Sequence, residues 1–245
     1  MEKAYKLLAS QREISNKRAK ELIDSGLVYV GDKRVKIARA LMDEDTKFRV
    51  EKIEDIEVIY EDRTIMAVNK PALIDSYSVA DFIGDDYRLI HRLDRETTGV
   101  LLLAKGRDFL EKAIDEFKNR RVKKRYLAWV EGIFFEEIKI DKPISTYKRG
   151  GKSFSKIDKR GGREAITVVK PLYIQGKKSK VEIEIETGRT HQIRVHLSSI
   201  GHPVVGDERY GSPTKTKRTL LHSKSISIFN YTFEAREPKD ILKYK

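Results

Sequence analysis

The sequence predicts an α+β protein in which a small α+β domain precedes a larger domain with a mixed, mainly antiparallel sheet. Two observations predict this class. Short apolar segments of strand length outnumber helical patterns from residue 64 onward, and a charged stretch separates these segments from the N-terminal part. We therefore expect a domain over residues 1–52, a linker over residues 53–62 and the larger domain over residues 63–245.

The first domain contains one clear amphipathic helix. Ser15 is suited to cap its N-terminus. Ala19, Leu22 and Ile23 recur at the helical period on one face. Gly26 follows at the point where a helix C-terminus favours a left-handed residue. The strand expected over residues 27–30 turns and returns over 34–37, so a helix packed on a small sheet is predicted.

The larger domain shows one amphipathic helix and several strands. The helix is expected over residues 107–119, with Leu110, Ala113, Ile114 and Phe117 on one face. Strands are expected over residues 64–69, 100–104, 126–130, 181–185, 220–221 and 226–229.

Charge indicates a polyanionic partner. Lys and Arg exceed Asp and Glu by 51 to 38, a net charge of +13, and residues 118–163 alone hold 15 basic and 5 acidic residues. Within that segment, residues 120–125 form a dense basic run, and residues 148–152 and 159–163 form basic loops softened by glycine. Such loops can follow a phosphate backbone, so nucleic acid is the expected partner. A solvated charged face is the alternative.

The absence of cysteine excludes disulfides, thiolate metal sites and cysteine nucleophiles. Residues 1–10 are charged and have no long apolar run, so no secretory signal is expected, and no segment has the length of a membrane span. A cytoplasmic protein without membrane contact is expected, and we expect it to be a monomer.

Three separated segments carry the candidate chemistry. In the first, His91 to Gly99, Asp94 lies among cations and hydroxyls that favour an ionised carboxylate, just before a buried strand. In the second, Tyr126 begins a strand, where its ring can stack on a base. In the third, Arg189 follows Gly188 at the expected start of a helix near Thr190, where it can pair with a carboxylate or a phosphate. Taken singly, each residue could be structural, and for Asp94 the spacing alone favours a carboxylate that only stabilises a turn.

Taken together, four motifs occur in order: H-R-L-D-x-x-T-T-G, K-x-Y-x-A-x-V-x-G, T-G-R-T-H-Q-I-R-V-H-L and G-H-P-V-V-G-D. This order is similar to that of the RluA-type pseudouridine synthases, over residues 65–229. Residues 1–52 resemble the S4 RNA-binding domain, which precedes the catalytic domain in some members of that family. The resemblance implies a catalytic domain of the pseudouridine synthase type behind an S4-like domain. It also implies an isomerase that acts on RNA and needs no metal or cofactor.

The resemblance also implies roles for individual residues. It implies that Asp94 is the catalytic aspartate, Tyr126 the active-site tyrosine and Arg189 the arginine that pairs with the aspartate. Arg194 is the weaker candidate for that pairing and is expected among the residues that bind substrate.

The other implied substrate-binding residues lie on both sides of Asp94. Arg92 matches the arginine that fills the RNA stack when the target uridine flips out. Leu221 lies in the final strand that closes the uracil pocket. His91 and Lys70 complete the expected substrate-binding set.

Several alternatives remain at this point. A metal hydrolase is disfavoured because His191 and His196 are five residues apart and cannot share a helical face. A non-catalytic S4-type RNA-binding protein would not need Asp94, Tyr126 and Arg189 together. For the substrate, ribosomal RNA is expected first, because members with an S4 domain often act there, and tRNA is the alternative.

Overall fold

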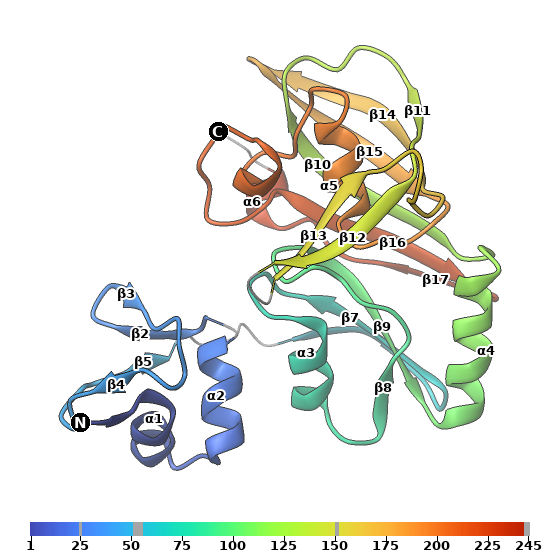
Figure 1. Ribbon diagram of the computed structural model, residues 1–245. Helices are drawn as coiled ribbons and strands as arrows, with labels where there is room; N and C mark the ends of the chain where they lie inside the picture. The colour runs from blue at the N-terminus through green and yellow to red at the C-terminus, as the bar shows by residue number, and fades with distance from the viewer. Residues whose placement is uncertain (25, 51–55, 150–151, 243–245) are drawn as a thin grey trace.

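The computed structural model of the chain describes residues 1–24, 26–50, 56–149 and 152–242. An N-terminal domain of small elements stands beside a larger domain built on one long sheet (Figure 1). The elements of the N-terminal domain are β1 (Glu2–Lys3), α1 (Ala4–Arg12), α2 (Asn16–Asp24), β2 (Val28–Val30), β3 (Lys33–Arg34), β4 (Leu41–Met42) and β5 (Arg49–Val50).

The N-terminal domain matches the helix and turn expected from its sequence. The backbone N–H of Arg18 donates to Ser15 Oγ at 3.1 Å, which satisfies one of the free donors at the start of α2. Gly26 adopts a φ of +66° just after that helix. Strand β2 lies between β3 and β5, and a core that includes Leu8, Ile23 and Phe48 packs helices and strands together.

The sheet of the larger domain runs in the order β11-β14-β15-β10-β16-β9-β7-β6, with β17 beside β16 and β8 beside β9. Every pair is antiparallel except β9 with β16, so the expected mixed, mainly antiparallel sheet is confirmed. Its strands are β6 (Glu57–Glu61), β7 (Ile65–Lys70), β8 (Tyr87–Leu89), β9 (Thr98–Lys105), β10 (Lys123–Glu131), β11 (Ile138–Asp141), β14 (Ile166–Gln175), β15 (Lys178–Ile185), β16 (Leu221–Ile228) and β17 (Tyr231–Glu234).

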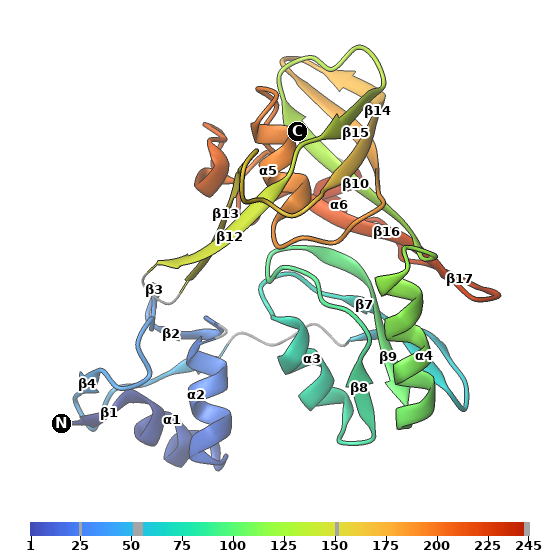
Figure 2. The same ribbon diagram turned by 45° about the vertical axis from the view of Figure 1, so that its right-hand side comes forward.

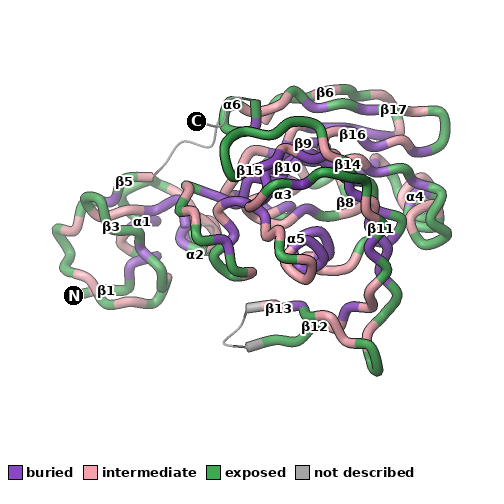
Figure 3. The backbone as a smooth tube through the Cα atoms, turned by 90° about the horizontal axis from the view of Figure 1, so that it is seen from above, coloured by how far each residue is buried: buried purple, intermediate pink, exposed green. Residues whose placement is uncertain are grey.

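The parallel pair divides the sheet into two halves, and it is short. Only His222 with Thr98 and Ser223 with Gly99 are in register across it. Strand β9 is buried on both faces, because Leu101 and Leu103 join one core while Val100 and Leu102 join the other. Figure 3 shows this buried centre in purple around β9, β10, β16 and α5. The two halves therefore meet along a strand that is packed on both faces.

Helices cover the sheet, and the expected helix over residues 107–119 is confirmed as α4 (Arg107–Lys118). The others are α3 (Ser76–Ile83), α5 (Gln192–Ser198), α6 (Lys239–Leu242) and a 3₁₀ turn, η1 (Glu208–Tyr210). Helix α3 was not predicted from the sequence, because it is short and begins with polar residues. Asp75 nevertheless caps it by accepting the backbone N–H groups of Tyr77 and Ser78 at 3.0 Å.

Some expected boundaries were wrong. Residues 57–61 of the expected linker form β6, which pairs with β7, while residues 51–55 lie outside the described residues. The two strands expected over 220–221 and 226–229 are the single strand β16, whose inward positions include small serines that carry no apolar signal. Among the described helices, none is long and apolar enough to cross a membrane.

A hairpin of β12 (Ile144–Arg149) and β13 (Lys152–Ile157) projects away from the sheet (Figures 2 and 3). The basic loop expected over residues 148–152 falls here, and its residues 150 and 151 lie outside the described part of the chain. Tyr147 stacks on Phe154 across the hairpin, with ring centroids 5.8 Å apart. The guanidinium of Arg209 lies 4.8 Å from the Phe154 ring, so the hairpin is held against η1.

Alanine in place of Gly99 should strongly destabilise the larger domain. Gly99 has a φ of +107°, and a Cβ there would lie 2.1 Å from the carbonyl oxygen of Ser223 across the parallel seam. We expect Gly99→Ala to lower the free energy of unfolding by about 3 kcal/mol or more, measured by urea denaturation. Gly211→Ala is the control, because Gly211 has a φ of +96° and open space around its Cβ position. Equal losses in the two variants would show that backbone strain alone, without the seam contact, accounts for the effect.

Candidate active site

A cavity of about 120 Å³ lies at the seam between the two halves of the sheet. The loop before β9 forms one wall, the segment leading into α5 forms the other, and β10 and β16 lie behind them. The lining residues are Arg92, Leu93, Asp94, Thr97, Tyr126, Ile185, Gly188, Arg189, Thr190, His191, Gln192, Ile193, Arg194 and Leu221. All three sequence motifs that carry candidate chemistry thus meet in one cavity.

The loop that carries Asp94 is fixed at several backbone points. Ser76 Oγ, on α3, bonds both the backbone N–H of Leu93, at 2.9 Å, and its carbonyl oxygen, at 3.1 Å. The backbone N–H of Thr97 donates to the Asp94 carbonyl oxygen at 3.0 Å. On the far side, Glu96 accepts the backbone N–H of Thr219 at 3.0 Å. The Asp94 side chain, 26% exposed, is therefore presented to the cavity from a rigid loop.

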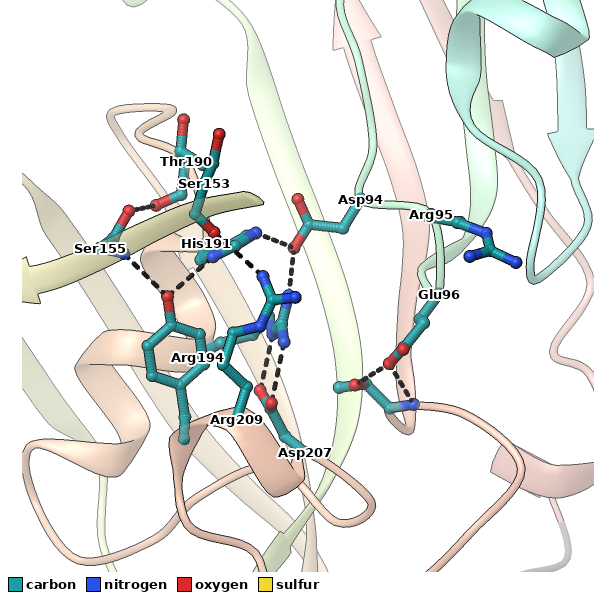
Figure 4. Close-up of polar contacts among 12 residues, drawn as sticks. Asp94, Arg95, Glu96, Ser153, Ser155, Thr190, His191, Arg194, Asp207 and Arg209 are labelled. Atoms are coloured by element: carbon teal, nitrogen blue, oxygen red, sulfur yellow. Dashed lines mark hydrogen bonds and ion pairs between the residues drawn. The ribbon is translucent and has the colours of Figure 1, made fainter. Parts of the chain in front are cut away.

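Arg194 is the partner of Asp94. Its Nη1 donates to Asp94 Oδ2 at 3.0 Å (Figure 4). Its Nε and Nη2 donate to the two oxygens of Asp207 at 2.6 and 2.8 Å, and its guanidinium lies 5.0 Å from the Tyr210 ring. Burial alone would lower the pKa of Arg194, but its hydrogen bonds to Asp207 and the charges of Asp207 and Asp94 raise that pKa above its ordinary value. Arg194 is thus a permanent cation that spans two carboxylates.

The expected pairing of Arg189 with Asp94 was wrong. Arg189 lines the cavity, but its Nε donates to the Glu164 carbonyl oxygen at 2.9 Å. The turn that separates the two arginines is built by Gln192, whose Oε1 accepts the backbone N–H of Arg189 at 3.0 Å and the Thr187 hydroxyl at 2.7 Å. This turn directs Arg194 on α5 toward Asp94. Sequence spacing could not separate the two arginines, because the turn depends on a side chain.

Alanine in place of Arg189 should weaken RNA binding more than catalysis. Arg189 is a half-buried cation on the cavity wall that makes no contact with the Asp94 carboxylate in the described structure. We expect Arg189→Ala to raise KM for RNA roughly three- to tenfold, to leave kcat within about twofold, and to reduce the salt dependence of binding. Steady-state kinetics at two salt concentrations measure both effects. If Arg189→Ala lowered kcat as much as an Arg194 variant does, Arg189 would have a role in catalysis after all.

Tyr126 and Leu221 form the back of the cavity, as their strands were expected to place them. Tyr126 lies on β10 and is 7% exposed, and Leu221 begins β16 and is 4% exposed. Burial, and then the charge of Asp94, raises the pKa of Tyr126 to about 12, so its phenol is neutral. The Arg92 side chain is exposed at the cavity rim and makes no hydrogen bond or ion pair with any described residue. An aromatic ring, an apolar side chain and a carboxylate thus surround one small space.

His91 and Lys70, which were expected to bind substrate, are not among the residues that line the cavity. The ring of His91 stacks on Phe117 of α4 at 5.2 Å, and burial lowers its pKa to about 3. Lys70 Nζ is buried and donates to the carbonyl oxygens of Pro71, Ile74 and Arg95 at 2.8, 2.7 and 3.2 Å. Both residues hold the loops around Asp94 in place. A position within a motif does not by itself show whether a residue has this structural role or contacts the substrate.

Two supporting residues were not assigned roles from the sequence. Asp207 is 1% exposed and lies in the motif G-H-P-V-V-G-D. Its partner, Arg194, lies in the preceding motif, and the two opposite charges could have suggested a structural ion pair. Arg218 is buried, bonds both oxygens of Asp240 at 2.7 Å, and donates to the Leu221 carbonyl oxygen at 3.0 Å. It fixes the start of β16 beneath the cavity, and no local motif marks it.

The metal-hydrolase alternative lacks a ligand cluster. No group of three or more His, Asp or Glu side chains among the described residues is arranged to hold a metal ion. His196 instead bonds Thr167 Oγ1 at 2.9 Å and the Lys142 carbonyl oxygen at 2.8 Å with its two ring nitrogens. It is a core histidine.

Residues 66–199 match the family model described as RNA pseudouridylate synthase. A Helicobacter pylori protein named as an uncharacterized RNA pseudouridine synthase is 50% identical over 242 residues, which cover 98% of this chain and 99% of that protein. Ribosomal large subunit pseudouridine synthase C of Buchnera aphidicola is 34% identical over 71% of this chain and 62% of that protein. The solved structure of human RNA Pseudouridylate Synthase Domain Containing 1 superposes with a TM-score of 0.65 at 29% identity, covering 78% of this chain and 86% of that one.

Fold, site and relatives agree on the class of the protein: it is an isomerase that makes pseudouridine in RNA. The chain belongs to the RNA pseudouridine synthase family, in the branch that the RluA-type motifs indicate.

Proposed function

We propose that this enzyme modifies uridine in ribosomal RNA and that Asp94 is its catalytic carboxylate. The observation that carries the proposal is the position of Asp94 in the seam cavity, where Arg194 holds one of its oxygens at 3.0 Å. The choice of RNA is supported by relatives, since the Buchnera aphidicola protein is named for the large ribosomal subunit.

The reaction needs little more than this constellation. The N1–C1′ bond of uridine breaks, the uracil turns and a C5–C1′ bond forms, while C5 loses its proton and N1 gains one. An ionised carboxylate can attack C1′, remove a proton so that a glycal forms, or add to the uracil ring. Tyr126 and Leu221 offer apolar surface to a flat base beside that carboxylate. The flipped uridine would therefore lie between Tyr126 and Asp94.

The surrounding charge supports a long RNA substrate. Residues 118–163, with a net charge of +10, run from the end of α4 through β10 and β11 to the projecting hairpin and the loop that follows it. Arg92, exposed at the rim, is placed to occupy the space that a flipped uridine leaves in the RNA stack. We assign residues 1–52 as an S4-like RNA-binding domain, because α1, α2 and the β2–β3–β5 sheet form the helical pair and small sheet expected of one.

The test is tritium release from RNA labelled at C5 of uridine, because forming the C5–C1′ bond sends that hydrogen to water. The purified enzyme should release tritium from ribosomal RNA of a strain that lacks the gene, and not from RNA of the parent strain, whose site is already modified. Mapping pseudouridine in both strains identifies the position. Release from the tRNA fraction alone would replace ribosomal RNA as the substrate, and no release from any RNA fraction would refute the proposal.

A further inference from the structure

His191 lies against the same oxygen of Asp94 that Arg194 binds. Its Nε2 is 3.9 Å from Asp94 Oδ2, while Arg194 Nη1 is 3.0 Å from that atom (Figure 4). Asp94 Oδ1 makes no hydrogen bond or ion pair within the described part of the chain. The two carboxylate oxygens are therefore inequivalent: Oδ2 faces two nitrogen groups, and Oδ1 is left to face the cavity.

The protonation pattern of His191 follows from its other contact. The backbone N–H of Ser155 donates to Tyr210 Oη at 3.0 Å, and His191 Nδ1 lies 2.7 Å from the same oxygen. A phenol has one proton to donate, and Ser155 N cannot accept it. Of the two described partners of Tyr210 Oη, only His191 Nδ1 can take that proton. When Tyr210 donates that proton to Nδ1, the ring proton of neutral His191 lies on Nε2, the nitrogen that faces Asp94.

Burial favours this neutral ring. It lowers the pKa of His191, although the charge of Asp94 acts in the opposite direction. The backbone of His191 is left-handed, with a φ of +54°, immediately before α5. This conformation is uncommon for a residue other than glycine, and it turns the imidazole out of the helix toward the cavity. The His191 side chain is thereby one of the groups that line the cavity.

The chain of bonds extends to the projecting hairpin. Ser155 lies on β13, and its hydroxyl donates to the Thr190 carbonyl oxygen at 2.7 Å, next to His191. Arg209 Nη1, beside Tyr210, donates to the Ser153 carbonyl oxygen at 3.0 Å. Tyr210 is thereby held between the hairpin and α5, and its hydroxyl oxygen cannot move away from His191 without losing the bond to β13.

We propose that His191 is a positioning residue for Asp94. Tyr210 holds it as the Nε2–H tautomer, so that together with Arg194 it holds Oδ2 and leaves Oδ1 as the oxygen that meets the nucleoside. This proposal rests on the proposed function of Asp94. The 3.9 Å separation is longer than a hydrogen bond, and such contacts in active sites tighten when substrate binds. A neutral N–H donor holds the carboxylate in place and leaves its negative charge available. A second full cation beside Arg194 would neutralise that charge.

The tautomer is directly measurable, independently of activity. The chain has five histidines, so selective ¹⁵N-histidine labelling gives a small set of ring signals, and His191→Gln identifies those of His191. We expect a protonated-type shift for Nε2 and an unprotonated-type shift for Nδ1 at neutral pH. In Tyr210→Phe we expect these shifts to move toward the averages of a tautomer mixture. A protonated Nδ1 in the wild type would overturn the proposal.

Kinetics test the consequence for catalysis. Tyr210→Phe keeps the ring beside Arg194 and removes only the hydroxyl, so we expect kcat to fall roughly tenfold to a hundredfold with KM for RNA nearly unchanged. Tyr231→Phe is the matched control, since it removes a hydroxyl that donates to Asp62 at 2.8 Å on the far edge of the sheet. An unchanged kcat in Tyr210→Phe would contradict the proposed role.

A second pair of variants separates position from folding. His191→Leu removes the donor, while His191→Gln can keep an N–H near the Nε2 position, and both place the same strain on the left-handed backbone. We expect the Gln variant to restore a substantial part of the kcat that the Leu variant loses, at equal thermal stability. If both variants match the wild type, His191 has no positioning role. If instead wild-type enzyme shows no tritium release while the NMR tautomer is as expected, the proposed function fails and the assigned tautomer stands.

Discussion

Asparagine in place of Asp94 should abolish tritium release while leaving the protein folded. If Asp94 is the catalytic carboxylate, as we propose, every course of the reaction needs its negatively charged oxygen, whether that oxygen attacks carbon or removes a proton. The amide of the Asp94→Asn variant would still offer an oxygen to Arg194 Nη1, and Arg194 would remain paired with Asp207. We therefore expect kcat to fall at least about a thousandfold, with the free energy of unfolding changed by less than about 1 kcal/mol.

Single-turnover tritium release and thermal unfolding measure the two quantities. Asp86→Asn is the matched control, because Asp86 is an exposed carboxylate in the segment before β8, away from the lining of the cavity. Asp94→Glu keeps the charge but moves it by a methylene, and it should retain more activity than Asp94→Asn. If Asp94→Asn turned over at the wild-type rate, Asp94 would have no catalytic role, and the assignment of the chain to its family would be unaffected.

The sequence was most informative where local patterns repeat. The amphipathic pattern of residues 107–119 predicted α4, and Ser15 with Gly26 predicted the ends of α2, because caps and periodicity act within one element. Strand β6 was assigned to a linker because it continues the charged sequence of residues 51–57 and is itself mostly exposed at the edge of the sheet. Its membership in the sheet depends on pairing with β7, which only the tertiary fold shows.

The site was predicted from a set of motifs. The prediction was wrong where two arginines of the same motif were both candidates for the same partner. Asp94, Tyr126 and Leu221 do line one cavity, as the resemblance implied. Arg189 and Arg194 are both within the third motif, and only the Gln192-built turn decides which one reaches Asp94. Periodicity cannot resolve this, because the chain is irregular from residue 186 to the start of α5.

Methionine in place of Arg194 should damage both stability and catalysis, by two separable routes. The side chain is 8% exposed, and Asp207, which it pairs with, is 1% exposed. Removing the cation leaves the Asp207 carboxylate buried without a counter-charge, and breaking such a pair costs about 3–5 kcal/mol. The same change frees Asp94 Oδ2 from its 3.0 Å bond, and a misplaced reacting group costs roughly a hundredfold in kcat. Urea denaturation and tritium release measure the two losses.

A double variant distinguishes the two routes. Adding Asp207→Asn to Arg194→Met removes the stranded charge, so the double variant should recover part of the lost stability and none of the lost kcat. Arg194→Lys should fail differently: it keeps a positive charge, but a single ammonium cannot supply the three separate N–H groups that Asp207 and Asp94 now receive. If activity returned with stability in the double variant, Arg194 would act only through the fold. Recovery of stability without activity would show that the Arg194 guanidinium positions the Asp94 carboxylate for the reaction that we propose.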